Sequence, residues 1–149
     1  MRETDNPFDF EINYGAIPRK ILEDANGFWE FMDDGLGYDN TNIAYVALKM
    51  GYRIILDDTN VAKCINLWPH IGGTSQNILS RERILNPPRW KWFVRQVENK
   101  TLPLKRDEKI DEKIKLDFEV PKEVEDKDAA TWVNEHAEEI SQKWEDFQK

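Results

Sequence analysis

The sequence predicts an α/β fold in which helices flank a short mixed sheet and an amphipathic helix follows at the C-terminus. Three observations lead to this prediction. Short helix-like and strand-like segments alternate up to residue 99. From Lys100 onward, 10 Lys or Arg and 15 Asp or Glu make half of the last 50 residues charged. One apolar stripe then returns near the end. We therefore expect a domain over residues 1–99, a charged linker over 100–127 and a helix over 128–149.

Two helices are predicted in the first third of the chain. The segment "RKILEDA" directly follows Pro18, which suits a first helical turn, and ends shortly before Gly27, a residue that commonly stops helices. The segment "NIAYVALKM" repeats apolar residues at helical spacing and stops at Gly51. Asn40 or Thr41 would cap this second helix, because a short polar side chain accepts the free amides of the first turn.

Strand-like segments and turn residues follow. Tyr52–Leu56 is a short β-branched run that predicts a strand, and Val61–Trp68 alternates enough to predict a second one. A short helix is expected around Gln76–Arg83. Asn86–Pro88 should break it, because proline lacks the amide that a helix interior needs. Another helix is then expected over residues 89–99.

The last segment predicts an amphipathic helix of which one face is apolar. An isolated helix of this length is marginal in water, so we expect it to dock on residues 1–99 or to pair with a second copy. The charged linker would then be a solvated tether. The only nearby histidine is expected to be structural, since no second ligand is spaced for a metal. The apolar face comprises Trp132, Val133, His136, Ile140, Trp144 and Phe147.

Composition excludes several classes of function. The net charge of −8 and the isoelectric point near 4.9 argue against a nucleic-acid partner and against an anionic membrane surface. The single cysteine, Cys64, rules out an internal disulfide and suits a reducing compartment. We find no signal peptide and no apolar run long enough for a membrane span. The expectation is a cytoplasmic protein.

Carboxylates gather at the start of the second predicted helix. Asp33 and Asp34 lie on a glycine-flanked loop, and Asp39 with Asn40 opens the helix itself. From the residues alone, Asp39 and Asn40 form a helix cap and the other two acids form a solvated surface. The other interpretation is that these acids do chemistry.

Three motifs occur in an order that resembles a known family. They are "AIPRKILEDANGFWE", "GYDNTNIAYVALKMGYRIIL" and "WPHIGGTS". Together, over about residues 13–77, they resemble the C-terminal, acceptor-side half of an inverting, family-two-like glycosyltransferase with a GT-A fold. The chain departs from the family pattern at Asn26 and Trp29, where the family has a glycine and an acid, and at Asn40, where it has a second acid.

The resemblance implies a catalytic base. Transfer from a nucleotide sugar requires the acceptor hydroxyl to lose its proton as it attacks, and a carboxylate at a helix start can take it. By resemblance this base is Asp39, although Asn40 at the second position leaves open which of the two matters. Asp33 and Asp34 would contact the acceptor. Trp29 would stack on a sugar ring, although tryptophan more often packs in a core.

The resemblance also implies a divalent metal, Mn or Mg, that neutralises the leaving diphosphate. His70 would lie near the metal or the diphosphate, and the loop of Gly72, Gly73, Thr74 and Ser75 would offer amides and hydroxyls to a phosphate. The structural interpretations are a hydrogen-bonded histidine and an ordinary tight loop. The implied partners are a nucleotide sugar and a glycan or other hydroxyl acceptor.

The donor-binding half of such an enzyme is not recognisable here. In the family, that half ends in an Asp-x-Asp metal motif after an apolar strand. The only Asp-x-Asp of this sequence, Asp126–Asp128, lies in the charged segment, with no strand expected before it. We therefore expect an acceptor-side part that needs a missing N-terminal half or a second copy, and its activity alone is left open. The competing hypothesis is a non-catalytic interaction or oligomerisation module that uses the C-terminal helix.

Overall fold

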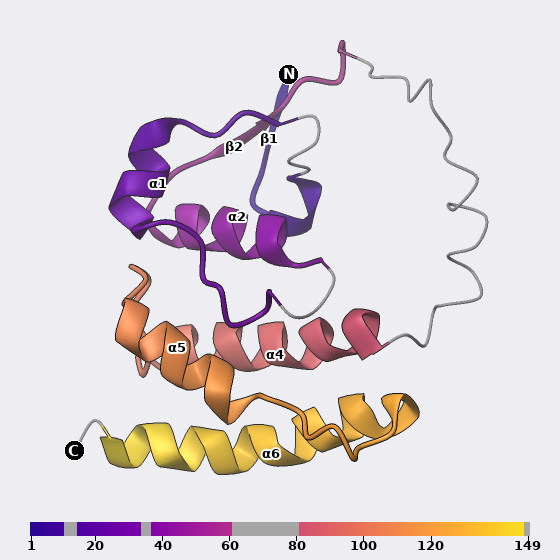
Figure 1. Cartoon of the computed structure of the whole chain (residues 1–149). Helices are drawn as coiled ribbons and strands as arrows, with labels where there is room; N and C mark the ends of the chain where they lie inside the picture. The colour runs from indigo at the N-terminus through magenta and orange to yellow at the C-terminus, as the bar shows by residue number, and fades with distance from the viewer. Residues whose placement is uncertain (11–14, 34–36, 61–80, 148–149) are drawn as a thin grey trace.

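The described residues form a mostly helical mixture of α and β structure that includes a two-stranded antiparallel sheet. The computed structural model describes residues 1–10, 15–33, 37–60 and 81–147. In Figure 1, α4 runs between α2 on one side and α6 on the other, with the sheet beside the N-terminus. In chain order the elements are β1 (Arg2–Thr4), the 3-10 helix η1 (Pro7–Asp9), α1 (Arg19–Ala25), α2 (Asp39–Lys49), β2 (Ile54–Leu56), α4 (Arg81–Glu98), α5 (Glu108–Asp117) and α6 (Asp126–Phe147).

The sheet joins the start of the chain to residue 56. Thr4 pairs with Ile54 and Arg2 with Leu56 in antiparallel register. The strand predicted at residues 52–56 is confirmed, whereas β1 lacked any sequence signal because three mostly exposed polar residues show no apolar alternation. The strand predicted at Val61–Trp68 lies outside the described residues.

The two predicted helices near the N-terminus are confirmed, and their ends follow local chemistry. Pro18 stands directly before α1, and Asn26 ends it in the left-handed conformation at φ 59°. Gly27 continues in that region at φ 84°, and its amide donates to the carbonyl of Leu22 at 2.8 Å. Past the end of α2, Gly51 takes φ 88°. The middle of α2 is buried from Thr41 to Ala47, so this helix is a central element rather than a surface one.

The prediction that Asn86–Pro88 ends a helix is wrong, because these residues lie inside helix α4. It runs unbroken over 18 residues with Pro87 and Pro88 inside it. Contacts on both sides of the prolines hold the segment helical. The side chain of Asn86 binds two carbonyls of the loop before α2, and the Arg89 guanidinium donates to the carbonyl of Phe118 at 2.8 Å. Tertiary contacts therefore override the local preference for a turn.

Residues 100–127 differ from the expected solvated linker. Asp107 caps α5 by accepting the amides of Lys109 and Ile110, and the apolar side chains of this segment recur every fourth residue on one face. That face packs into the core, and the many charges lie on the other. A segment that is half charged can thus still contribute one buried stripe. The stripe and its flanks are Leu102, Ile110, Ile114, Phe118 and Val120.

Docking of the C-terminal helix on residues 1–99 is confirmed, since α6 packs along α4. The indole of Trp92 and the amide of Gln96 both donate to the Ser141 hydroxyl, at 3.0 and 2.9 Å. Of the predicted face, Val133 and Ile140 are buried, and Trp132 is partly buried and stacked on His136 with ring centroids 3.8 Å apart. Among the α6 side chains that the structure describes, Ala129 and Ala137 are buried as well.

The core lies between α2, α4 and α6 and is rich in aromatic rings. Phe31 stacks on Phe93 with centroids 5.6 Å apart, and Trp92 meets Phe118 edge-on at 5.0 Å. Each of these four side chains is almost fully buried. The segment that precedes Asp33 is therefore held in a tightly packed core.

Candidate functional site

The exposed start of α2 carries the candidate base. Asp39 is the first residue of the helix, where the aligned peptide dipoles favour a negative charge. Tyr38 precedes it in the left-handed region at φ 76°, a conformation that costs energy for a bulky residue. The predicted cap at Asn40 or Thr41 is wrong, because the helix begins at Asp39 and both residues lie inside its first turn. No side chain caps this helix start.

Asp33 is the second acid that the structure describes in this region. Although the residue lies at the surface, nearby protein atoms withdraw its carboxyl from water, and this burial raises its pKa. The negative charges of Glu30, Asp111 and Asp39 raise the pKa further, while Lys115 opposes them. Asp33 and Asp39 are thus close enough for their charges to interact.

The raised pKa of Asp33 predicts a pH-dependent effect of Asp33→Asn. The folded protein holds this carboxyl protonated more readily than the unfolded chain, so the unfavourable ionisation costs stability only above the ordinary pKa of 3.8. We expect Asp33→Asn to raise the melting temperature at pH 7 and to leave it unchanged at pH 3. Thermal unfolding at both pH values measures this, with Asp5→Asn on the exposed N-terminal segment as the control. An equal effect at both pH values would contradict the argument.

The side chain of Asn86 in α4 holds the loop that carries these acids. We call the described residues of this segment, 32, 33, 37 and 38, the acidic loop. The Asn86 side-chain nitrogen donates to the carbonyl of Met32 at 3.0 Å and to the carbonyl of Gly37 at 2.7 Å. The whole side chain is buried, at 0% exposure. Sequence reasoning missed this residue, because an asparagine before two prolines is typical of a turn.

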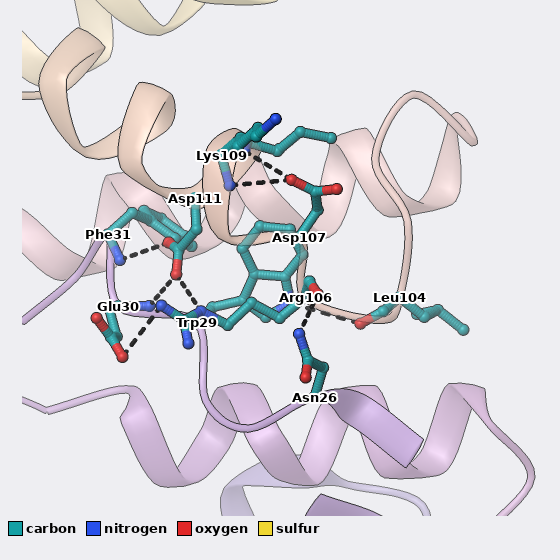
Figure 2. Close-up of polar contacts among 10 residues, drawn as sticks. Asn26, Trp29, Glu30, Phe31, Leu104, Arg106, Asp107, Lys109 and Asp111 are labelled. Carbon is teal, nitrogen blue, oxygen red and sulfur yellow. Dashed lines mark hydrogen bonds and ion pairs between the residues drawn. The ribbon is translucent and has the colours of Figure 1, made fainter. Parts of the chain in front are cut away.

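A buried carboxylate anchors the chain just before the acidic loop. The Asp111 carboxylate accepts the backbone amides of Glu30 and Phe31, each at 2.9 Å, and the guanidinium of Arg106 (Figure 2). Arg106 also pairs with the Glu30 carboxylate at 3.0 Å. We call these four residues the Asp111 cluster. The sequence analysis missed the Asp111 cluster because it interpreted residues 100–127 as a solvated linker. One signal was present, since Asp111 lies next to Ile110 in a segment whose apolar residues are regularly spaced.

Trp29 does not fit the expected sugar contact. Its side chain is 2% exposed and lies edge-on to Phe31 and Phe93. Its indole donates to the carbonyl of Leu104 at 3.4 Å, as Figure 2 shows. The tryptophan is therefore part of the core, which is the usual place for this residue.

The other predicted site residues divide into two groups. Asn40 is half-buried next to Asp39 in the first turn of α2. The structure therefore brings Asp33, Asp39 and Asn40 to one end of this helix. The remaining residues lie outside the described parts of the chain; these are Asp34, His70, Gly72, Gly73, Thr74 and Ser75.

The expected divalent metal has no matching ligand group in the described part of the chain. Within residues 1–10, 15–33, 37–60 and 81–147, no three His, Cys, Asp or Glu side chains are arranged to hold a metal ion. Asp33 and Asp39 alone are too few ligands to hold one. The metal stays a prediction that depends on His70.

Comparisons of the chain with protein-family models, with curated proteins and with solved structures find no match. Among the described residues no helix is both long and apolar enough to cross a membrane. The glycosyltransferase resemblance therefore rests on the motifs in the sequence.

Proposed function

We propose that this chain is the acceptor-side part of a GT-A-like glycosyltransferase that moves a sugar from a nucleotide-sugar donor to an acceptor hydroxyl. One observation carries the proposal: Asp39 stands exposed at the first position of α2, beside Asp33, in the chain order that the resemblance requires. That order is helix α1, an acidic loop, helix α2 and strand β2.

In this proposal Asp39 is the general base. Its carboxylate removes the proton of the acceptor hydroxyl while the hydroxyl oxygen attacks the anomeric carbon of the donor sugar. The new bond joins the acceptor oxygen to that carbon. The bond between the carbon and the phosphate oxygen breaks, and the nucleoside diphosphate leaves with the electron pair. The start of α2 favours the ionised carboxylate that this step needs.

Asp33 would hold the acceptor in place. The Asp33 carboxylate can accept a hydrogen bond from a second hydroxyl of the acceptor. The Asp111 cluster supports the same interpretation, because it fixes the backbone of Glu30 and Phe31 shortly before Asp33.

The donor-binding half would cover a hollow whose lining is partly apolar and partly charged. The hollow has a volume of about 470 Å³ and is lined by residues of α1, α2 and β2 among others. Its charged lining residues include Asp9, Arg53, Asp57 and Asp58. Its apolar lining includes Ile17, Ile21, Ala44, Ala47 and Ile54.

The alternative function is an interaction module based on the C-terminal helix, and the unrecognised donor half favours it for the chain by itself. In the described part of α6, however, Val133 and Ile140 already pack within the chain, where α6 lies along α4. We therefore favour the transferase.

Binding experiments on the chain test the proposal. Screened against an array of glycans, the labelled chain is expected to bind one glycan or a few related ones. The double variant Asp33→Asn/Asp39→Asn should weaken this binding at least about tenfold, because hydrogen bonds to charged groups are worth about 1.5–3 kcal/mol. Nucleotide sugars with manganese should give no heat of binding in calorimetry, because no donor-binding half is recognisable in these residues.

A charge-matched control separates the site from general electrostatics. Asp5→Asn/Glu135→Gln removes the same charge from two exposed positions elsewhere and should leave glycan binding unchanged. The proposal would be overturned if no glycan binds, or if both double variants weaken binding equally. Micromolar, saturable binding of a nucleotide sugar would show that the chain carries the donor side instead.

A further inference from the structure

The buried amide of Asn86 makes hydrogen bonds in one direction only. Its nitrogen donates to the carbonyls of Met32 and Gly37, at 3.0 and 2.7 Å. Its side-chain oxygen is buried with no hydrogen-bond partner among the described residues. Leaving a buried acceptor unsatisfied costs stability. An asparagine at this position is therefore best explained by the two carbonyls that its side-chain N–H groups bind.

Those two donors hold both ends of the acidic loop. Met32 directly precedes Asp33, and Gly37 lies two residues before Asp39. Because one nitrogen contacts both carbonyls, the two ends of the loop cannot move apart without losing a buried hydrogen bond. Tyr38 takes φ 76°, a region that a bulky residue rarely adopts, so local preferences alone do not favour this path.

Asn86 itself stands on a rigid part of the molecule. Further along α4, the Arg89 guanidinium binds the carbonyl of Phe118, and Trp92 and Phe93 are almost fully buried in the core. A side chain whose backbone is fixed in this way can set the position of a loop rather than follow it.

We propose that Asn86 is a positioning residue, whose amide ties both ends of the acidic loop to α4 and thereby sets the spacing between Asp33 and Asp39. The contacts of Asn86 from which this proposal is argued lie among the described residues. Its meaning for catalysis rests on the proposed function, in which Asp39 removes a proton from an acceptor that Asp33 holds.

Two variants of Asn86 and one matched control test this role in the full chain. Asn86→Ala removes the donors, and Asn86→Asp keeps the size but replaces the donors by an ionised acceptor that faces two carbonyls. Gln96→Ala is the control, because Gln96 is a buried amide of the same helix that binds Ser141 and not the acidic loop. If Asn86 only stabilises the fold, all three variants should change the acidic loop alike.

The first measurement follows the loop by NMR and needs no substrate. In both Asn86 variants, hydrogen exchange of the Asp33 amide should be at least about tenfold faster, since about 1.4 kcal/mol corresponds to tenfold. The titration of Asp33 should also move toward its ordinary pKa, because the carboxyl becomes better hydrated and the charges of Glu30, Asp111, Asp39 and Lys115 are no longer held around it. Gln96→Ala should change neither. Unchanged exchange and titration in Asn86→Ala would overturn the proposal.

The second measurement repeats glycan binding with the same variants. Both Asn86 variants should bind the selected glycan at least about tenfold more weakly, while Gln96→Ala binds normally. If the NMR changes occur but glycan binding is unaffected, the link between loop spacing and the site is wrong. If the wild-type chain binds no glycan, the proposed function fails, and the NMR result still decides the positioning role by itself.

Discussion

Asp111→Asn is expected to lower the free energy of unfolding by about 3–5 kcal/mol, the usual cost of removing one partner from a buried ion pair. The Asp111 side chain is 2% exposed and that of Arg106 is 15% exposed. Without the carboxylate, the Arg106 guanidinium keeps a buried positive charge, and the amides of Glu30 and Phe31 lose charged acceptors. Since small domains have only about 5–15 kcal/mol in total, this change should remove much of the stability.

Urea unfolding followed by tryptophan fluorescence measures the loss. Asp117→Asn is the matched control, because Asp117 lies on the same helix and pairs with Lys113 at 2.7 Å in a more exposed place. Such a pair is worth about 0–1 kcal/mol. Equal losses for Asp111→Asn and Asp117→Asn would show that the Asp111 cluster does not anchor residues 30 and 31.

Asp39→Asn is expected to lower turnover by about 10²–10⁴-fold in the transferase that contains the donor half, because general base catalysis contributes that much. Affinity for the donor should stay nearly unchanged, since a base acts in the transition state and adds little to ground-state binding. The variant should also lose about 0.3–1 kcal/mol of stability, because a negative charge leaves the start of α2.

Steady-state kinetics with released nucleoside diphosphate as the signal measure this effect. Asp5→Asn removes a charge far along the chain from the site and should keep full turnover. A loss of less than about fivefold for Asp39→Asn, below the range expected of a base, would reduce Asp39 to a favourable charge at a helix start. The proposed catalytic role would then be wrong even if the glycan binds.

Several elements followed from the sequence alone because their signals are local. Pro18 and Gly27 bracket α1, and Gly51 follows α2, since each restricts or frees the backbone at its own position. The apolar spacing near the C-terminus predicted α6 and its docking, because an isolated amphipathic helix must bury its apolar side. The acidic loop was also visible, because Asp33 and Asp39 are close in the chain.

Other features depended on contacts between residues far apart in the sequence. The sequence allowed Trp29 to be a sugar contact, but in the structure it packs against Phe31 and Phe93. In the sequence Asp111 is one charged residue among many, but in the structure it binds Arg106 and the amides of residues 30 and 31.

The sequence by itself determined the helices at both ends of the chain and the place of the acidic loop, because proline, glycine and apolar spacing act within a few residues. Only the tertiary structure decided that α4 continues through Pro87 and Pro88, that residues 100–127 join the core, and that Asn86 holds the acidic loop. The physical reason is that a buried polar group is stable only where its partners are, and those partners lie about 50 to 80 residues away along the chain.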